Sequence, residues 1–199
     1  MSRIIVDSIR NSSASSDGIT LASDGSVTIP GNATCSGTAT GFGIGGKILQ
    51  VVQTFKRDSF STSNNYATEI TGLNASIAKT SASNKILITV NIGYGRSGRD
   101  FTRFYLYEDS AELTAYQGTG GSSGGLFMGD YNHLQSTTEE TYSMYNISKT
   151  VLVDGQNDTN SHTYKIFGTA NGITLYINRR SYSYDWTTTS GITLMEVAA

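Results

Sequence analysis

The segment from Arg179 to Trp186, with the sequence RRSYSYDW, gathers side chains that are suited to binding. Aromatic rings stack on the C–H faces of hexoses, while guanidinium and carboxylate groups hold hydroxyls or acidic substituents. Such side chains bind at a modest entropic cost. The alternative is that these rings pack under the loop or against a neighbouring subunit. We predict a glycan-binding site formed by Arg179, Arg180, Tyr182, Tyr184, Asp185 and Trp186.

Two further loops are candidates for recognition. The segment YGRSGRDF carries Arg96, Arg99 and Asp100 between two segments with strand character. These residues could contact the same glycan, or they could form an ion pair that stiffens the turn. The segment KRDSFSTSNNY, residues 56–66, is expected to form another rim loop. Loops on a rigid scaffold commonly carry recognition residues.

Catalytic patterns are weak, and we expect a protein that is not an enzyme. The glycine-rich segment GTGGSSGG, residues 118–125, lacks the lysine and following helix of a phosphate-binding loop, so we interpret it as a mobile loop. Glycoside cleavage requires two facing carboxyl groups. The pairs Glu108–Asp109 and Glu139–Glu140 are sequence neighbours, which point to opposite faces of a strand. Subunit contacts could still bring distant acids together, so a depolymerase is a less favoured alternative.

The sequence predicts no cofactor and no metal. His133 and His162 are the only histidines, and His162 begins a strand-like segment, where a surface or packing role is expected. Cys35 is the only cysteine, which excludes an intrachain disulfide and a Cys-based zinc site within one chain. No spaced calcium motif is present.

Composition limits the architecture and the partners. A chain of 199 residues with 37% apolar residues supports one ordinary domain plus an extension. The formal charge of −2 gives no general attraction for nucleic acid or anionic lipid, so we expect neither as a partner. No stretch approaches the length of a membrane span or a signal-peptide core, which predicts a soluble protein made in the cytoplasm without membrane insertion.

From about residue 45 onward, apolar residues alternate as they do in strands. The segment KILITVNIG is clearest, because Ile86, Ile88, Val90 and Ile92 share one face. With no helical pattern between the segments, we expect antiparallel sheets in a two-layer β-sandwich or jelly roll. Further strands are predicted around residues 47–55, 73–77, 101–107, 142–153, 162–168, 173–178 and 192–197, with shorter ones near 113–116 and 126–128.

The last predicted strand is apolar on both faces. Ile192 and Leu194 point one way, whereas Met195 and Val197 point the other way. A strand of this kind indicates a subunit boundary against one face. The alternative is that a loop of the same chain covers that face.

Residues 1–46 are too polar to enclose a core alone. DGITL is echoed by DGSVTI, and Ile19, Val27 and Cys35 fall eight residues apart. This repeat predicts short strands joined by Asp-Gly turns, with neighbouring chains supplying the missing cover. The alternative is a flexible tail.

Four segments carry a resemblance to a known family. MSRIIVDSIRN resembles the opening of marine and cyanobacterial phage tail-fibre and other virion proteins. GGKILQVVQTF, LNASIAKTSASNKILITVNIGYG and GITLMEVA resemble the strand signatures of their C-terminal heads. The resemblance covers residues 1–11 and 45–199. None of these segments is a catalytic motif.

The resemblance implies a homotrimer located in the virion. Residues 1–46 would form an intertwined β stalk that attaches to other tail or baseplate proteins, and residues 47–199 a jelly-roll head similar to the C1q and tumour-necrosis-factor folds. The head would bind a host-surface polysaccharide or lipopolysaccharide. The alternative function is a purely structural virion component, such as a head fibre or capsid decoration protein, without a specific ligand.

Overall fold

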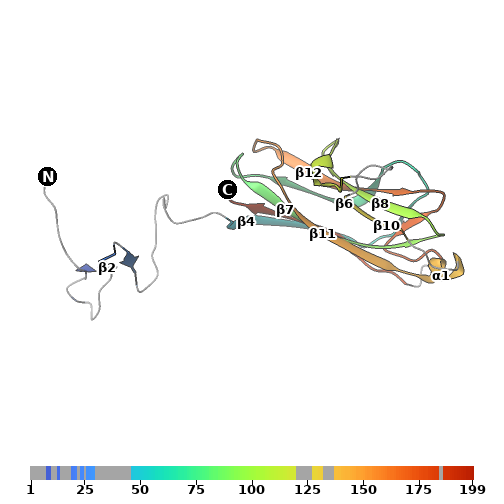
Figure 1. The fold of residues 1–199 in the computed structure, drawn as a ribbon, viewed down its shortest axis with the longest axis horizontal. Helices are drawn as coiled ribbons and strands as arrows, with labels where there is room; N and C mark the ends of the chain where they lie inside the picture. The colour runs from blue at the N-terminus through green and yellow to red at the C-terminus, as the bar shows by residue number, and fades with distance from the viewer. Residues whose placement is uncertain are drawn as a thin grey trace. The chain divides into compact units, whose positions relative to one another are not determined.

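The structure is a computed structural model in which the chain divides into two units, Met1–Gly43 and Ile44–Ala199. We call them the N-terminal unit and the C-terminal unit and describe each separately (Figure 1). The predicted roles of a stalk and a head remain predictions. The described residues are 8–9, 13, 19–21, 23–24, 26–29, 46–119, 127–131, 137–183 and 186–199.

In the N-terminal unit, three short strands pair antiparallel in the order β1-β2-β3. They are β1 (Ser8–Ile9), β2 (Ile19–Leu21) and β3 (Val27–Thr28). The amide of Ser26 donates to the Asp24 side chain (2.8 Å), a local bond typical of tight turns. The short strands predicted from the DG repeat are therefore confirmed at β2 and β3, whereas Cys35 lies outside the described residues. Ile9, Val27 and Ile29 are exposed.

The C-terminal unit consists of two antiparallel sheets. In the first sheet, one edge of β7 pairs with β14 and, further along, with β13, and the other edge pairs with β11. β4 pairs with β14, and β5 pairs with β13. The second sheet has the order β10-β8-β12-β6, with β9 paired to β8. The first sheet contains β4 (Ile48–Lys56), β5 (Phe60–Thr62), β7 (Lys85–Arg96), β11 (Tyr145–Val153), β13 (Leu175–Ile177) and β14 (Ser190–Val197). The second contains β6 (Thr68–Ala78), β8 (Phe101–Glu108), β9 (Ala111–Glu112), β10 (Met128–Tyr131) and β12 (Ser161–Ala170).

One apolar core joins the two sheets, so the unit is all-β and consistent with a β-sandwich. Its inner residues follow the alternation expected for strands with one face in the core. From the first sheet, Ile86, Ile88, Val90 and Ile92 are each 0% exposed, which confirms the prediction for this strand. The second sheet contributes Leu73, Ile77, Phe104, Leu106, Tyr164 and Ile166.

Several predicted elements differ from the structure. Residues 137–142, in part expected to be strand, form the helix α1 (Thr137–Tyr142), and β11 begins only at Tyr145. Residues 114–116 form a 3₁₀ turn, η1 (Thr114–Tyr116), instead of a strand. The rim loop at 56–66 contains the short strand β5. The expected mobile loop at 118–125 lies mostly outside the described residues, as does His133.

β14 lies in the middle of the first sheet, between β4 and β7. Ile192 and Leu194 are 0% exposed, whereas Met195 and Val197 lie half-buried on the opposite face. The predicted two-sided character of this strand is therefore confirmed. The start of β4 and the C-terminus lie at one end of the unit, and α1 lies at the opposite end (Figure 1).

Candidate functional site

Beside α1, three aromatic side chains surround one arginine. The guanidinium carbon of Arg180 lies 5.5 Å from the ring centre of Tyr142, 5.9 Å from that of Tyr182 and 5.8 Å from that of Trp186. The rings of Tyr142 and Tyr182 stack with their centres 4.2 Å apart. Trp186 and Tyr182 are each 63% exposed, and Tyr142 is 44% exposed. We call these four residues the aromatic cluster.

The aromatic cluster borders a hollow of about 270 Å³, lined by Tyr142, Met144, Arg180 and Trp186. A positive charge held over ring faces gains cation–π attraction at an energy of about 0.5–1 kcal/mol when exposed. A guanidinium group also has the donor geometry that suits a carboxylate, phosphate or sugar hydroxyl. The hollow therefore combines flat apolar walls with one positive charge.

Main-chain contacts hold the loop of Arg180 in place. The amide of Tyr182 donates to the carbonyl of Thr141 (3.0 Å), which joins the loop to the last turn of α1. Arg180 donates from Nε and Nη2 to the hydroxyl of Ser183 (3.2 and 2.9 Å). Arg179 forms a β-bridge with Thr187, so the two ends of the loop are paired. These contacts hold residues 179–183 of the loop against α1 and pair Arg179 with Thr187.

The buried side chain of Asn178 anchors both sides of this loop to the first sheet. Its Nδ2 donates to the carbonyls of Lys56 (2.8 Å) and Asp58 (2.9 Å), and its Oδ1 accepts from the hydroxyl of Ser190 (2.6 Å). Its carbonyl accepts from the amide of Thr188 (2.9 Å). Asn178 has a φ of +62°, a conformation that asparagine tolerates better than most residues.

The structure brings together Arg180, Tyr182 and Trp186 from the predicted glycan site, whereas Arg179 has a different place. Arg179 is 8% exposed, and its guanidinium lies 4.0 Å from the ring centre of Tyr176. It donates to the carbonyls of Arg180 and Ser181, so it supports the loop from beneath. The remaining predicted residues, Tyr184 and Asp185, lie outside the described residues.

The predicted second cluster lies on a different turn from the aromatic cluster. Arg96 is 0% exposed and packs with its guanidinium 4.8 Å from the ring centre of Tyr145, which does not suit contact with a surface ligand. Asp100 accepts from the amide of Phe101 and from Asn171 of a neighbouring loop. Arg99 is exposed on the same turn. This turn joins β7 to β8, whereas the aromatic cluster is carried by α1 and the loop after β13.

Sequence reasoning missed Tyr142 and Met144, because apolar alternation extended the next strand back to Tyr142. A helix signal was present, since Thr137 and Glu140 have the S/T-x-x-E spacing of a helix start. The short helix ends at Tyr142 and turns that ring towards Tyr182. Pairing of rings from separate segments is a tertiary property with no local sequence pattern.

The outer face of the first sheet has an apolar half and a polar half. In the apolar half, Val51, Met195, Leu87 and Leu152 form one row across four strands. Val51 and Leu152 are 56% and 45% exposed. We call the following residues the apolar patch: Ile48, Val51, Leu87, Leu152, Met195 and Val197.

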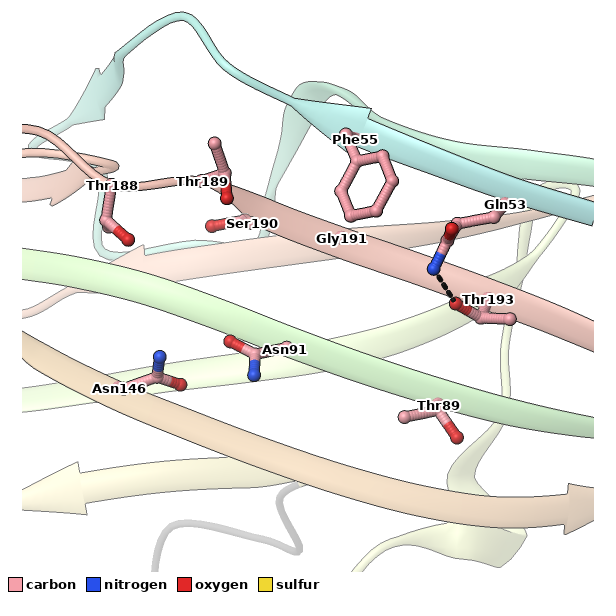
Figure 2. A pocket seen from close by; sticks show the side chains of 10 residues that line it. All are labelled: Gln53, Phe55, Thr89, Asn91, Asn146, Thr188, Thr189, Ser190, Gly191 and Thr193. Atoms are coloured by element: carbon pink, nitrogen blue, oxygen red, sulfur yellow. Dashed lines mark hydrogen bonds between the residues drawn. The ribbon is translucent and has the colours of Figure 1, made fainter.

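The polar half contains a second hollow of about 390 Å³ (Figure 2). Its lining consists of amide, hydroxyl and glycine residues with one aromatic ring, that of Phe55, and none of the lining side chains is ionisable. We call it the polar hollow. Figure 2 shows Phe55 on one side and Asn91 and Asn146 on the other, with Gly191 between them.

Of the acidic residues considered for catalysis, Glu108 and Asp109 are hydrogen-bonded to neighbouring residues. Glu108 is 3% exposed and accepts from the hydroxyl of Tyr164 (2.8 Å). Burial and this bond raise the pKa of Tyr164 far above its usual range. Asp109 accepts from Thr163 and contacts His162. Among the described residues, no group of three or more His, Cys, Asp or Glu side chains has an arrangement for a metal ion.

Comparison with known proteins gives no family model that matches this chain and no match among curated proteins. Within the part of the chain that the structure describes, no helix has the length and apolarity needed to cross a membrane.

Proposed function

We propose that this chain is a bacteriophage tail-fibre subunit that trimerises and binds a host-surface glycan through loops of the C-terminal unit. The observation that carries the binding role is the exposed aromatic cluster around Arg180. The tail-fibre assignment rests on the sequence resemblance in residues 1–11 and 45–199.

The aromatic cluster has the chemistry of a sugar site. Trp186 and Tyr182 offer exposed ring faces, on which the C–H surface of a hexose stacks without losing its hydrogen bonds to water at the rim. Arg180 supplies directed donors for a carboxylate, a phosphate or a pair of hydroxyls. Bacterial capsular polysaccharides and lipopolysaccharides contain these groups. We propose that an acidic sugar unit occupies this hollow.

The trimer is supported by uncovered apolar surface in both units. Ile9, Val27 and Ile29 are exposed in the N-terminal unit, and the apolar patch is exposed in the C-terminal unit. Contiguous apolar surface of this kind commonly marks a protein contact. Identical copies would cover both surfaces at once, with the N-terminal units attached to other virion proteins.

A jelly-roll fold of the C1q and tumour-necrosis-factor type is part of the proposal. The strand orders β4-β14-β7-β11 and β6-β12-β8-β10 support it, because among these eight strands only β8 and β10 follow one another in the same sheet, and every other step crosses to the opposite sheet. Double-sheet jelly rolls are built from eight strands in this way.

Purified chain tests the proposal in two measurements. Light scattering should give a mass close to three times 21.3 kDa. An array of purified bacterial capsular polysaccharides and lipopolysaccharides should show binding, and Trp186→Ala with Tyr182→Ala should abolish it. Tyr105→Ala is the matched control, because Tyr105 is partly exposed on β8 and lies outside the candidate recognition segments. A monomer, or no binding to any glycan by the wild-type chain, would contradict the proposal.

A purely structural virion component is the second candidate. The apolar patch favours it, because that surface requires assembly but no ligand. A trimer that binds no glycan on the array would establish this alternative over the receptor-binding role.

A further inference from the structure

We propose that the polar hollow on the first sheet binds uncharged sugar units of the same glycan whose acidic unit lies at Arg180. This inference rests on the proposed function and deepens it, because it assigns a second subsite and a ligand of several sugar units. The polar hollow would be a neutral subsite.

Three strands build the polar hollow. Gly191 of β14 pairs with Phe55 of β4 on one side and with Asn91 of β7 on the other. A β-carbon on Gly191 would lie 3.3 Å from the Phe55 ring, so the ring rests beside bare backbone. Phe55 remains 55% exposed. The result is an aromatic wall, a glycine floor and an amide wall (Figure 2).

The amide wall has free hydrogen-bonding capacity. The exposed side chains of Asn91 and Asn146 form no hydrogen bond with the residues that the structure describes, and Figure 2 shows them beside each other on neighbouring strands. By contrast, Gln53 donates to Thr193 (2.8 Å) at the far end of the polar hollow. Each amide can donate and accept at once, which matches the adjacent hydroxyls of a hexose.

The ligand class follows from the lining. An exposed ring binds the apolar face of a sugar, and amide and hydroxyl groups bind its edge. The polar hollow offers no ionised side chain to attract or neutralise a charge. Its volume of about 390 Å³ falls within the usual range for small-ligand pockets. Uncharged sugar units fit these properties, whereas an anionic ligand would lose solvation without compensation.

The two hollows follow one another along the same two segments. Met144 lines the hollow of the aromatic cluster, and Asn146, two residues later, lines the polar hollow. On the segment that leads into β14, Trp186 lines the hollow of the aromatic cluster and Thr188, two residues later, lines the polar hollow. An oligosaccharide could therefore pass from Arg180 towards Phe55.

Gly93 allows Thr188 to pack closely on the sheet. Thr188 lies directly over Gly93, where an added β-carbon would come within 2.1 Å of the Thr188 methyl group. Any side chain at position 93 would therefore displace Thr188, which lines the polar hollow.

The alternative occupant of the polar hollow is a neighbouring subunit. Such a contact fits the apolar patch better, because burying the amides of Asn91 and Asn146 without partners is unfavourable. A row of hydrogen-bonded side chains separates the two regions, including Thr89 and Thr150, whose hydroxyls lie 3.0 Å apart. We assign the apolar patch to subunit contact and the polar hollow to the glycan.

The test uses the full chain and oligosaccharides prepared by partial hydrolysis of a polysaccharide that the array identifies. Titration calorimetry should show affinity that rises with the number of sugar units. Phe55→Ala should weaken binding of the long oligosaccharide at least tenfold, and Phe55→Trp should retain it. Tyr105→Ala is the matched control, since Tyr105 is partly exposed on β8 of the other sheet and lies outside the candidate recognition segments. Light scattering of each variant should give the wild-type mass.

The outcomes separate this inference from the proposed function. Loss of binding in Trp186→Ala with full binding in Phe55→Ala would overturn the second subsite and leave the proposed function in place. A Phe55→Ala protein with a reduced mass would also overturn it, because the polar hollow would then be a subunit contact. Absence of all glycan binding by the wild-type chain would contradict the proposed function itself.

Discussion

The main chain of Arg180 lies against Gly95 of β7: a methyl group on Gly95 would be 2.8 Å from the Cα of Arg180 and 2.7 Å from the carbonyl oxygen of Arg179. Both contacts are with backbone, which cannot swing aside as a flexible side chain can. Gly95 thereby determines where the loop of the aromatic cluster lies on the sheet.

We predict that Gly95→Ala displaces this loop and weakens glycan binding at least tenfold, the effect of about 1.4 kcal/mol. The two-sheet core should persist, so circular dichroism should remain close to that of the wild-type chain. Gly118→Ala is the control, because nothing lies within 4 Å of its added β-carbon. Unchanged binding by Gly95→Ala would show that the cluster does not depend on this contact.

His162 is expected to make stability fall as the pH rises above about 6.5. Its ring nitrogens lie 2.7 Å from a carboxylate oxygen of Asp109 and 2.9 Å from one of Asp158, and these hydrogen bonds raise the pKa of His162. A raised pKa means that the stabilisation is complete below the unfolded value of about 6.5 and is lost as pH rises through the folded pKa.

His162→Asn should therefore lower the melting temperature more at about pH 5.5 than at about pH 9. The hydrogen bond with His162 is the main cause that lowers the pKa of Asp109 and the pKa of Asp158. The stabilisation from these two carboxylates is therefore lost only in acid. Thermal melts across this range provide the measurement. An equal loss at both pH values would show that protonated His162 does not hold the two aspartates.

The stability of the C-terminal unit should fall in acid because of Glu196. Burial alone would raise the pKa of Glu196, but hydrogen bonds from Asn84, Gln50 and Thr80 outweigh burial and lower the pKa to about 2. Its carboxylate accepts from Asn84 at 2.6 Å and from Gln50 at 2.7 Å. The stabilisation is present above the unfolded pKa of about 4.5 and is lost as pH falls towards 2.

We expect Glu196→Gln to reduce the free energy of unfolding by roughly 2–3 kcal/mol at pH 7. The NH₂ group of the new glutamine would face the N–H donors that now bind the carboxylate. Urea denaturation at pH 7 and at about pH 2.5 should show the difference between variant and wild-type chain shrinking in acid. Glu69→Gln is the control, since Glu69 is partly exposed and pairs with Lys165 across 3.5 Å. A difference that does not change with pH would contradict this account.

The apolar patch should control assembly. Leu152→Lys places a charge at the exposed end of the row formed with Val51, Met195 and Leu87. Burial of an unpaired charge strongly disfavours a subunit contact. We expect light scattering to show a fall from about three times 21.3 kDa towards the monomer mass. Thr159→Lys, on an exposed loop, should leave the mass unchanged. If the Leu152→Lys protein still forms a trimer, the subunit contact must lie outside the apolar patch.

The sequence predicted the strands of the core well, because strict alternation, as in Ile86 to Ile92, requires one face to be buried. It failed where a tertiary contact decides the structure. Arg96 has the composition of a surface ligand residue, yet it is buried against Tyr145, a partner contributed by another strand. Tyr142 was assigned to a strand, whereas packing of its ring on Tyr182 belongs to a short helix and a distant loop.

The position of β14 between β4 and β7 has a consequence for synthesis on the ribosome. Strand β4 is made early, yet its hydrogen-bonded partner emerges about 140 residues later, as the bond between Gln53 and Thr193 illustrates. Folding rates fall as contacting residues become more distant along the chain. Until residues 190–197 leave the exit tunnel, the first sheet has an open slot with two unpaired edges, so a chaperone or a neighbouring nascent chain would have its best opportunity to bind there.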